Sequence, residues 1–293
     1  MLVSLKELME DANKKGYAVG AFNACNLESL IAIIRAAEET EKAVIVNYAE
    51  VHSPLISIDE IGPIMVRYAQ NASVPVCVHL DHGNSLESCM KAIRLGFTSV
   101  MLDVSSADYE ENVKNTGLIC RLAHSVGVTV EAELGHIFSS DNGLGQTKIQ
   151  ETLDAFEREE DVYTNPETAK DFVERTGVDA LAIAFGTAHG VYQKKPKLDL
   201  ERIKLIKQKI DVPFVMHGGS GLTKEEFQTA IKNGIRKINY YTYMALAGGR
   251  AVKKALDVRS LDDNIFFHDI PLIGIEAMKE DVKKAIRIFS MED

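Results

Sequence analysis

Three features are missing from the sequence: an apolar run long enough to cross a membrane, an excess of positive charge, and closely spaced cysteines. No apolar stretch approaches the roughly 18 residues that a membrane span requires. The opening segment MLVSLKELMEDANKKG has neither the basic nor the unbroken apolar part of a secretory signal. The chain carries 33 Lys and Arg against 43 Asp and Glu, a net charge of −10. We therefore expect no membrane and no nucleic-acid partner, because both would need a concentrated basic patch.

The spacing of the cysteines indicates the cellular compartment of the protein. There are four, far apart and without a C-x-x-C pair: Cys25, Cys77, Cys89 and Cys120. Thiols spaced in this way are typical of small core residues in a reducing environment, so we predict a cytoplasmic protein. The composition, 46% hydrophobic and 26% charged, is that of an ordinary globular chain with enough apolar material for a core.

Eight short, apolar, β-branched segments recur along the chain and alternate with amphipathic stretches. The segments span residues 18–23, 43–48, 74–80, 99–104, 128–134, 180–185, 213–218 and 237–240. Each is almost continuously apolar, as expected for strands buried on both faces of a parallel sheet. The stretches between them carry helix-start signals, which are Asn26, the Ser57/Glu60 and Thr223/Glu226 spacings, and Asn165-Pro166.

This repeat predicts an α/β protein, a single (β/α)8 TIM barrel over residues 1–293. A doubly wound open sheet is the alternative, but its usual G-x-G-x-x-G turn does not follow the first segment. The interval between the fifth and sixth segments is much longer than the others. Within it, we expect residues 135–163 to form a mobile lid or, alternatively, a surface helical excursion. Residues 245–293 have helical patterning and predict a C-terminal helical extension, either a cover or a dimer contact.

Three histidines share a position that favours metal binding. His82, His189 and His217 each lie at or after a predicted strand end and are each followed by glycine. Strand carboxyl ends converge on one face of a barrel, and three histidines with an open fourth position form a usual catalytic zinc site. A single histidine is more often a structural residue, but the shared placement favours ligands. The other histidines are expected to be structural: His52, His79, His124, His136 and His268.

The segment GGSG at residues 218–221 follows His217 and precedes a predicted helix. Backbone N–H groups of such a loop, together with a helix N-terminus, can hold phosphate oxygens. Barrels commonly bind phosphate in the loops after the seventh and eighth strands, although GGSG alone could be a plain turn. Zinc, phosphate and carboxylates together predict polarisation of a carbonyl in a phosphorylated sugar. The strand-end acids are Asp81, Asp103, Glu131 and Glu133.

Six motifs occur in order along the chain: VHLDHG, VMLDVS, EAELG, GTAHGVY, VMHGGSGL and KIN. Together they resemble the class II, zinc-dependent ketose-bisphosphate aldolases, which include fructose-bisphosphate and tagatose-bisphosphate aldolases. The resemblance runs from KGYAVGAFNACNLE to about Ala245. It implies a (β/α)8 barrel, a Zn²⁺ cofactor with a monovalent cation allowed beside it, a phosphorylated ketose substrate, and a homodimer or homotetramer.

The resemblance also implies roles for individual residues. Asp81 matches the aspartate that exchanges a proton with the C4 hydroxyl, and Asp141 falls where a loop acid removes the C3 proton. Asp103 and Glu133 match positions that hold the metal in an alternative location. The implied zinc ligands are His82, His189 and His217. The implied substrate-binding residues are Asn23, Gly190, Gly218, Gly219, Ser220, Asn239 and Thr242.

The chain departs from the family pattern where the aldehyde part of the substrate would bind. The usual N-x-D-T-D is replaced by NYYTY, so that Tyr241 stands for an aspartate and Tyr240 adds bulk. Ala49 stands where a serine-containing loop is common. The D-P-R whose arginine holds the far phosphate is replaced by FFHD around His268. We expect a preferred aldehyde other than glyceraldehyde 3-phosphate.

These parts predict an aldolase that cleaves or forms a ketose 1-phosphate or ketose 1,6-bisphosphate, with dihydroxyacetone phosphate and an aldehyde as products. Zinc would polarise the C2 carbonyl and stabilise an enediolate at C3. A Schiff-base lysine is disfavoured, because no lysine ends a core strand and Lys237 is expected to begin one. Two alternatives are another zinc-dependent sugar-phosphate barrel enzyme, an epimerase or hydrolase, and a catalytically silent sugar-phosphate-binding barrel.

Overall fold

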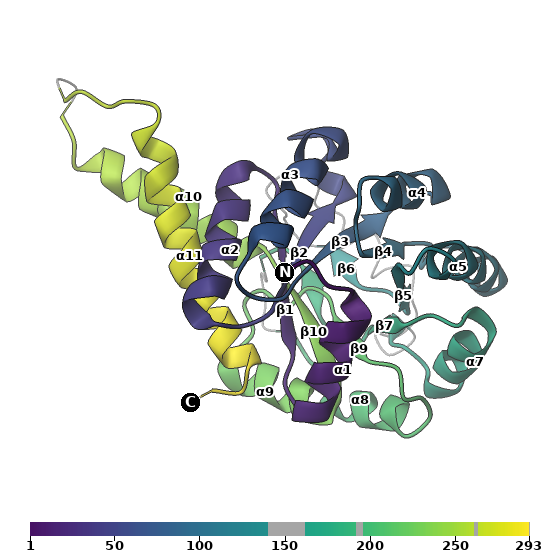
Figure 1. Cartoon of the computed structure of the whole chain (residues 1–293). Coiled ribbons are helices and arrows are strands. Elements are labelled where there is room, and N and C mark those ends of the chain that lie inside the picture. The colour runs from purple at the N-terminus through teal and green to yellow at the C-terminus, as the bar shows by residue number, and fades with distance from the viewer. Residues whose placement is uncertain (140–161, 192–195, 261–262, 293) are drawn as a thin grey trace.

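The computed structural model describes residues 1–139, 162–191, 196–260 and 263–292. Eight parallel strands form a closed barrel in the order β1-β10-β9-β7-β5-β4-β3-β2 (Figure 1). They are β1 (Val19–Asn23), β2 (Val44–Ala49), β3 (Val76–Gly83), β4 (Ser99–Leu102), β5 (Thr129–Leu134), β7 (Ala180–Ile183), β9 (Phe214–Met216) and β10 (Ile235–Tyr240). All eight predicted segments are strands of the barrel, which confirms the predicted (β/α)8 fold.

Alternate residues of each strand enter two different cores. In β2, Val44 and Val46 pack outward against the helices, whereas Ile45 points into the barrel with Ala21 and Cys77. The inner core also contains buried residues of α1 (Leu5–Lys15), which lies against the amino-terminal ends of the strands. Because both faces of each strand are buried, most residues of the strands are apolar, as the sequence indicated.

Helices surround the barrel between consecutive strands (Figure 1). They are α2 (Leu27–Thr40), α3 (Ile58–Asn71), α4 (Leu86–Arg94), α5 (Tyr109–His124), α7 (Pro166–Thr176), α8 (Leu200–Lys207) and α9 (Lys224–Asn233), with a short 3₁₀ helix η1 (Glu50–His52) after β2. The predicted starts are confirmed: Asn26 and Asn165 cap α2 and α7, and capping boxes open α3 and α9.

The C-terminal extension is a helical hairpin of α10 (Thr242–Asp257) and α11 (Asp269–Phe289). α11 packs along α2 and α10, and the end of the hairpin projects beyond the barrel (Figure 1). Phe266 and Phe267 near its tip are exposed. Among the described residues, no helix combines the length and apolar character that crossing a membrane would take.

Part of the long interval after β5 lies beside the mouth of the barrel. The short strands β6 (Phe138–Ser139) and β8 (Ala188–His189) pair in parallel, which places the backbone of His189 next to the segment following β5. Most of the segment predicted to be a lid, and Asp141 with it, falls outside the described residues.

Candidate active site

The carboxyl ends of the strands surround a cavity of about 390 Å³. Segments far apart in the sequence contribute to it, as expected for a barrel whose strand ends converge on one face. Residues predicted for the site that line this cavity are Asn23, Asp81, His82, Asp103, Glu133, His189, Gly190, Gly218, Ser220, Asn239 and Thr242. His217 lies directly behind them, with its ring centroid 4.6 Å from that of His82.

The three predicted metal ligands come together at the bottom of the cavity. One ligand atom from each of His82, His189 and His217 lies within 4.8 Å of the others. His82 adopts φ +50°, a conformation that costs a non-glycine residue about 1–3 kcal/mol. Its Nδ1 lies 2.6 Å from Oδ2 of Asp103, a contact that helps to hold the ring in place.

The remaining nitrogens of two of these rings have no hydrogen-bond partner. Nε2 of His217 lies 2.8 Å from Oε1 of Glu131, on the side of the ring away from the cluster. Within the described residues, Nε2 of His82, Nδ1 of His217 and Oε2 of Glu133 are buried without a hydrogen bond. Buried polar atoms are rarely left in this state, and metal-bound histidines usually have a carboxylate on the other nitrogen. The donor set therefore fits a divalent cation.

Asp81 is buried beside this cluster and remains ionised. Burial would raise the pKa of Asp81, but the charges of His82 and Lys237 outweigh it and lower this pKa to about 2. The amide of Asn239 donates to Oδ1 of Asp81 over 2.9 Å and orients the carboxylate. Burial lowers the pKa of His189 to about 3, so this ring is neutral at neutral pH. The site thus offers a carboxylate that can accept a proton next to a neutral ligand.

The loop after β9, which the sequence predicts to bind phosphate, is tightly packed against the chain around Ala188. Gly218 has φ +64°, and a Cβ there would collide with the carbonyl of Ala188, so the position requires glycine. Ser220 is buried at the cavity wall, and α9 begins a few residues later. Gly219 does not line the cavity, and its N–H donates to the carbonyl of Asn239.

A neighbouring part of the cavity wall contains Ala49 and Tyr241, two residues that depart from the family pattern, and the N–H of Tyr241 donates to Oγ of Ser220 over 3.3 Å. Ala49, Val51, His52 and Tyr241 line it, and the rings of His52 and Tyr241 lie 4.7 Å apart. His52 is only 5% exposed, burial lowers its pKa, and its Nδ1 has no hydrogen bond within the described part of the chain. The hydroxyl of Tyr241 lies 3.6 Å from Sγ of Cys25.

The structure places three residues differently from what the sequence predicted. His52, expected to be structural, is in the cavity wall, and no local pattern distinguishes it from other histidines. His268 lies outside the cavity, with its side chain 77% exposed at the start of α11. Lys237 is the third residue of β10 rather than the first, and its ammonium lies inside the barrel, 2.7 Å from Glu131. No described lysine or arginine lines the cavity.

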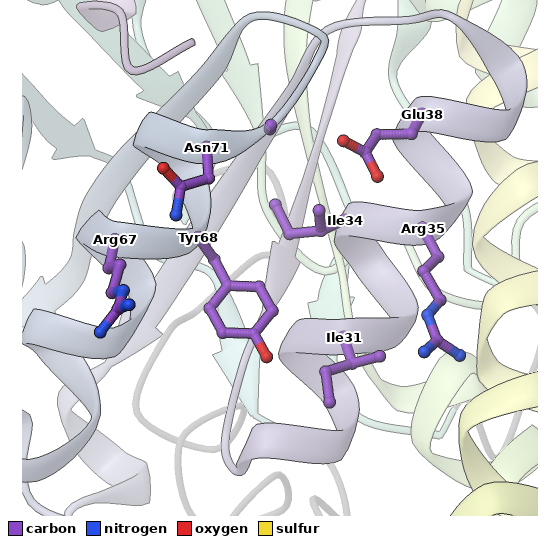
Figure 2. A pocket seen from close by; sticks show the side chains of 8 residues that line it. Ile31, Ile34, Arg35, Glu38, Arg67, Tyr68 and Asn71 are labelled. Carbon is purple, nitrogen blue, oxygen red and sulfur yellow. The ribbon is translucent and has the colours of Figure 1, made fainter.

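A second hollow of about 310 Å³ lies on the outer surface between α2 and α3. Figure 2 shows Arg35 and Arg67 at its opposite edges, with Tyr68 and Ile34 between them. The side chains come from two adjacent helices and do not converge on one point. We assign no chemistry to this groove.

Comparisons with known proteins identify the family of the chain. The family described as "Fructose-bisphosphate aldolase class-II" matches residues 3–293. A fructose-bisphosphate aldolase of Staphylococcus epidermidis is 37% identical over 295 residues, which cover 98% of this chain and 97% of the relative. The crystal structure of the YdjI aldolase from Escherichia coli K12 superposes with a TM-score of 0.84 at 36% identity and covers 99% of this chain and 97% of that one.

The family match over residues 3–293 defines this protein as an aldolase, and its closed parallel barrel has a cluster of histidines and carboxylates that could hold a metal ion. The chain belongs to the class II fructose-bisphosphate aldolase family. The family as a whole acts on phosphorylated sugars, which confirms the predicted class of substrate.

Proposed function

We propose that this aldolase uses Zn²⁺ to cleave or form a ketose 1-phosphate or ketose 1,6-bisphosphate, with dihydroxyacetone phosphate as one product. The observation that carries the proposal is the convergence of His82, His189 and His217 beside the ionised Asp81 in one cavity. Zn²⁺ bound to these histidines would act as a Lewis acid toward the C2 carbonyl.

The side chains of the site would perform the remaining steps. The Asp81 carboxylate accepts the proton of the C4 hydroxyl while the C3–C4 bond breaks, which releases the aldehyde and leaves the bonding electron pair at C3. Asn239 keeps Asp81 oriented through its amide. Gly190, Gly218, Ser220 and Thr242 would hold the phosphate, and Asn23 would contact the same half of the substrate. Asp141 remains the proposed acid and base at C3.

Asp103 and Glu133 would contribute to the metal site in different ways. Oδ2 of Asp103 is engaged by His82, and Oδ1 accepts from the hydroxyl and the N–H of Ser105. Oε2 of Glu133 has no hydrogen bond within the described residues. Both could still hold the ion in an alternative position, because ligand atoms of His82, Asp103 and Glu133 lie within 4.8 Å of one another.

We further propose that the preferred aldehyde is not glyceraldehyde 3-phosphate. The supporting observation is the wall formed by Ala49, His52 and Tyr241, with no lysine or arginine among the described residues of the cavity. Loss of a charge-assisted contact to the far phosphate would cost about 1.5–3 kcal/mol, roughly ten- to a hundredfold in binding. A homodimer or homotetramer and a cytoplasmic location remain part of the proposal.

The test is a triose-phosphate-coupled assay with the zinc-loaded protein, using fructose and tagatose 1,6-bisphosphates beside the corresponding 1-phosphates. Release of dihydroxyacetone phosphate that stops on chelation and returns with Zn²⁺ would support the proposal. Full activity after exhaustive chelation would contradict the role of the metal. Isomerised sugar or inorganic phosphate without triose phosphate would indicate an epimerase or a hydrolase, and binding without turnover a silent barrel.

A further inference from the structure

A buried ion pair lies in the barrel just below the proposed metal site. Glu131 is on β5 and Lys237 on β10, and both side chains are fully buried. Oε2 of Glu131 lies 2.7 Å from Nζ of Lys237, and Oε1 lies 2.8 Å from Nε2 of His217. A buried ion pair of this kind adds little net stability compared with apolar residues of similar volume. The pair therefore calls for a function other than packing.

The chemistry of the donors sets the direction of each hydrogen bond. The Lys237 ammonium has only donors, and an ionised carboxylate only accepts. Since Glu131 accepts at both oxygens, Nε2 of His217 must carry the hydrogen and donate it. In the neutral ring, which is the form that can bind a metal ion, Nδ1 of His217 is then the nitrogen with a lone pair, and it lies 3.3 Å from Oε2 of Glu133. Two lone-pair atoms at this separation suit a cation shared between them.

We infer that Glu131, held by Lys237, is a positioning residue that fixes the tautomer of His217 so that Nδ1 is available to the metal ion. This inference rests on the metal site of the proposed function and on no step of the aldol reaction. His82 has a parallel arrangement, in which Asp103 contacts Nδ1 and leaves Nε2 free. Asp103 therefore leaves Nε2 of His82 for the metal ion, and Glu131 leaves Nδ1 of His217 for the same ion.

The substitution Glu131→Gln tests the direction of these hydrogen bonds. An amide next to the Lys237 ammonium must turn its oxygen toward Lys237 and its NH₂ toward His217. Nε2 of His217 would then have to accept, and the proton would move to Nδ1, where it blocks the metal ion. We expect the dissociation constant for Zn²⁺ to rise by about 10- to 100-fold, the usual effect of losing such a partner.

The double variant Glu131→Gln/Lys237→Met separates this explanation from simple damage to the core. Without the ammonium, the amide oxygen is free to turn back to His217, and we expect most of the affinity for Zn²⁺ to return. The matched control is Thr98→Val, which removes the 2.7 Å hydrogen bond from Thr98 to the carbonyl of Val3 at the other end of the barrel. It should lower the melting temperature without changing the affinity.

The measurements are Zn²⁺ competition against a chromophoric chelator and ¹⁵N spectra of the imidazole rings, both on the full-length metal-free protein. The spectra should show the proton of His217 on Nε2 in the wild type and on Nδ1 after Glu131→Gln. Unchanged affinity in Glu131→Gln, or a double variant that binds no more tightly, would overturn the inference. If the variants do not fold, a wild-type His217 that is protonated on Nδ1 alone would overturn it as well. Neither measurement uses a substrate. The inference can therefore be tested even if the protein shows no aldolase activity.

Discussion

The two halves of the active-site cavity are built differently. The metal and phosphate half is held by polar contacts, in which carboxylates orient the rings of His82 and His217 and Asn239 orients Asp81. The aldehyde half is an aromatic wall of His52 and Tyr241, with Ala49 beside it and no described lysine or arginine. Chemistry that requires a defined protonation state needs fixed partners, whereas selection among aldehydes needs a surface of a certain shape and polarity.

This difference implies that substitutions in the first half affect the reaction with every substrate, and substitutions in the second change only the choice of aldehyde. The exchange of the C3 proton of dihydroxyacetone phosphate with solvent measures the first half alone, because it needs no aldehyde. Cleavage of different ketose phosphates measures both halves together.

The largest effect is expected from His217→Ala. Loss of one of three ligands should remove most bound Zn²⁺ and lower turnover by at least about 10³-fold, because Lewis-acid assistance amounts to several kcal/mol. Both proton exchange and cleavage should fall, measured together with the metal content per chain. His124→Ala is the control, since His124 pairs with Asp179 outside the cavity. Normal zinc content and normal turnover in His217→Ala would show that His217 is not a metal ligand.

Asp81→Ala should impair proton transfer without affecting metal binding. We expect zinc content to stay the same and turnover in cleavage to fall by about 10²- to 10⁴-fold, the usual range for loss of a general base. Proton exchange on dihydroxyacetone phosphate should fall much less, because the C4 hydroxyl is not part of that substrate. An unchanged kcat for cleavage would show that Asp81 is not the proton acceptor.

Tyr241→Asp restores the residue that the family pattern has at this position. We expect kcat/KM for fructose or tagatose 1,6-bisphosphate to rise by about fivefold, since one regained hydrogen bond to a sugar hydroxyl contributes about 1 kcal/mol. Proton exchange should change little. Tyr241→Phe, which keeps the ring and removes the hydroxyl, is the matched control. A loss of proton exchange in Tyr241→Asp would mean that the two halves are not separable.

The smallest effect concerns pH. Burial lowers the pKa of His52 below its ordinary value of about 6.5, so the ring takes up its proton at a lower pH than an ordinary histidine. Any change that His52 causes in the ratio of kcat/KM for a phosphorylated and an unphosphorylated aldehyde should therefore be centred below about pH 6.5. The ratio is compared in wild type and His52→Gln, which removes the titratable group. A step near pH 6.5 that disappears in His52→Gln would contradict the prediction.

Much of the molecule could be predicted from the sequence because the relevant forces are local. Continuous apolar segments predicted all eight barrel strands, and Asn26 and Asn165 marked helix starts through hydrogen bonds to residues two or three positions away. The strand-end positions of His82, His189 and His217 could be identified because parallel strands of a barrel all end on one face. Alternation within a strand also places Glu131 and Glu133 on the same side of β5.

Contacts across the barrel could not be predicted in this way, because they depend on strand register and on which side chains reach each other over long sequence separations. Lys237 meets Glu131 across 106 residues, and His52 meets Tyr241 at the wall of the cavity. His268, aligned by motif with a phosphate-binding arginine, instead lies exposed at the start of α11. The sequence by itself determined the fold and the types of residue at the site, since period and capping act over a few residues. The tertiary structure decided which nitrogen of His82 and of His217 forms a hydrogen bond with a carboxylate and what forms the aldehyde wall, since both depend on partners from distant strands.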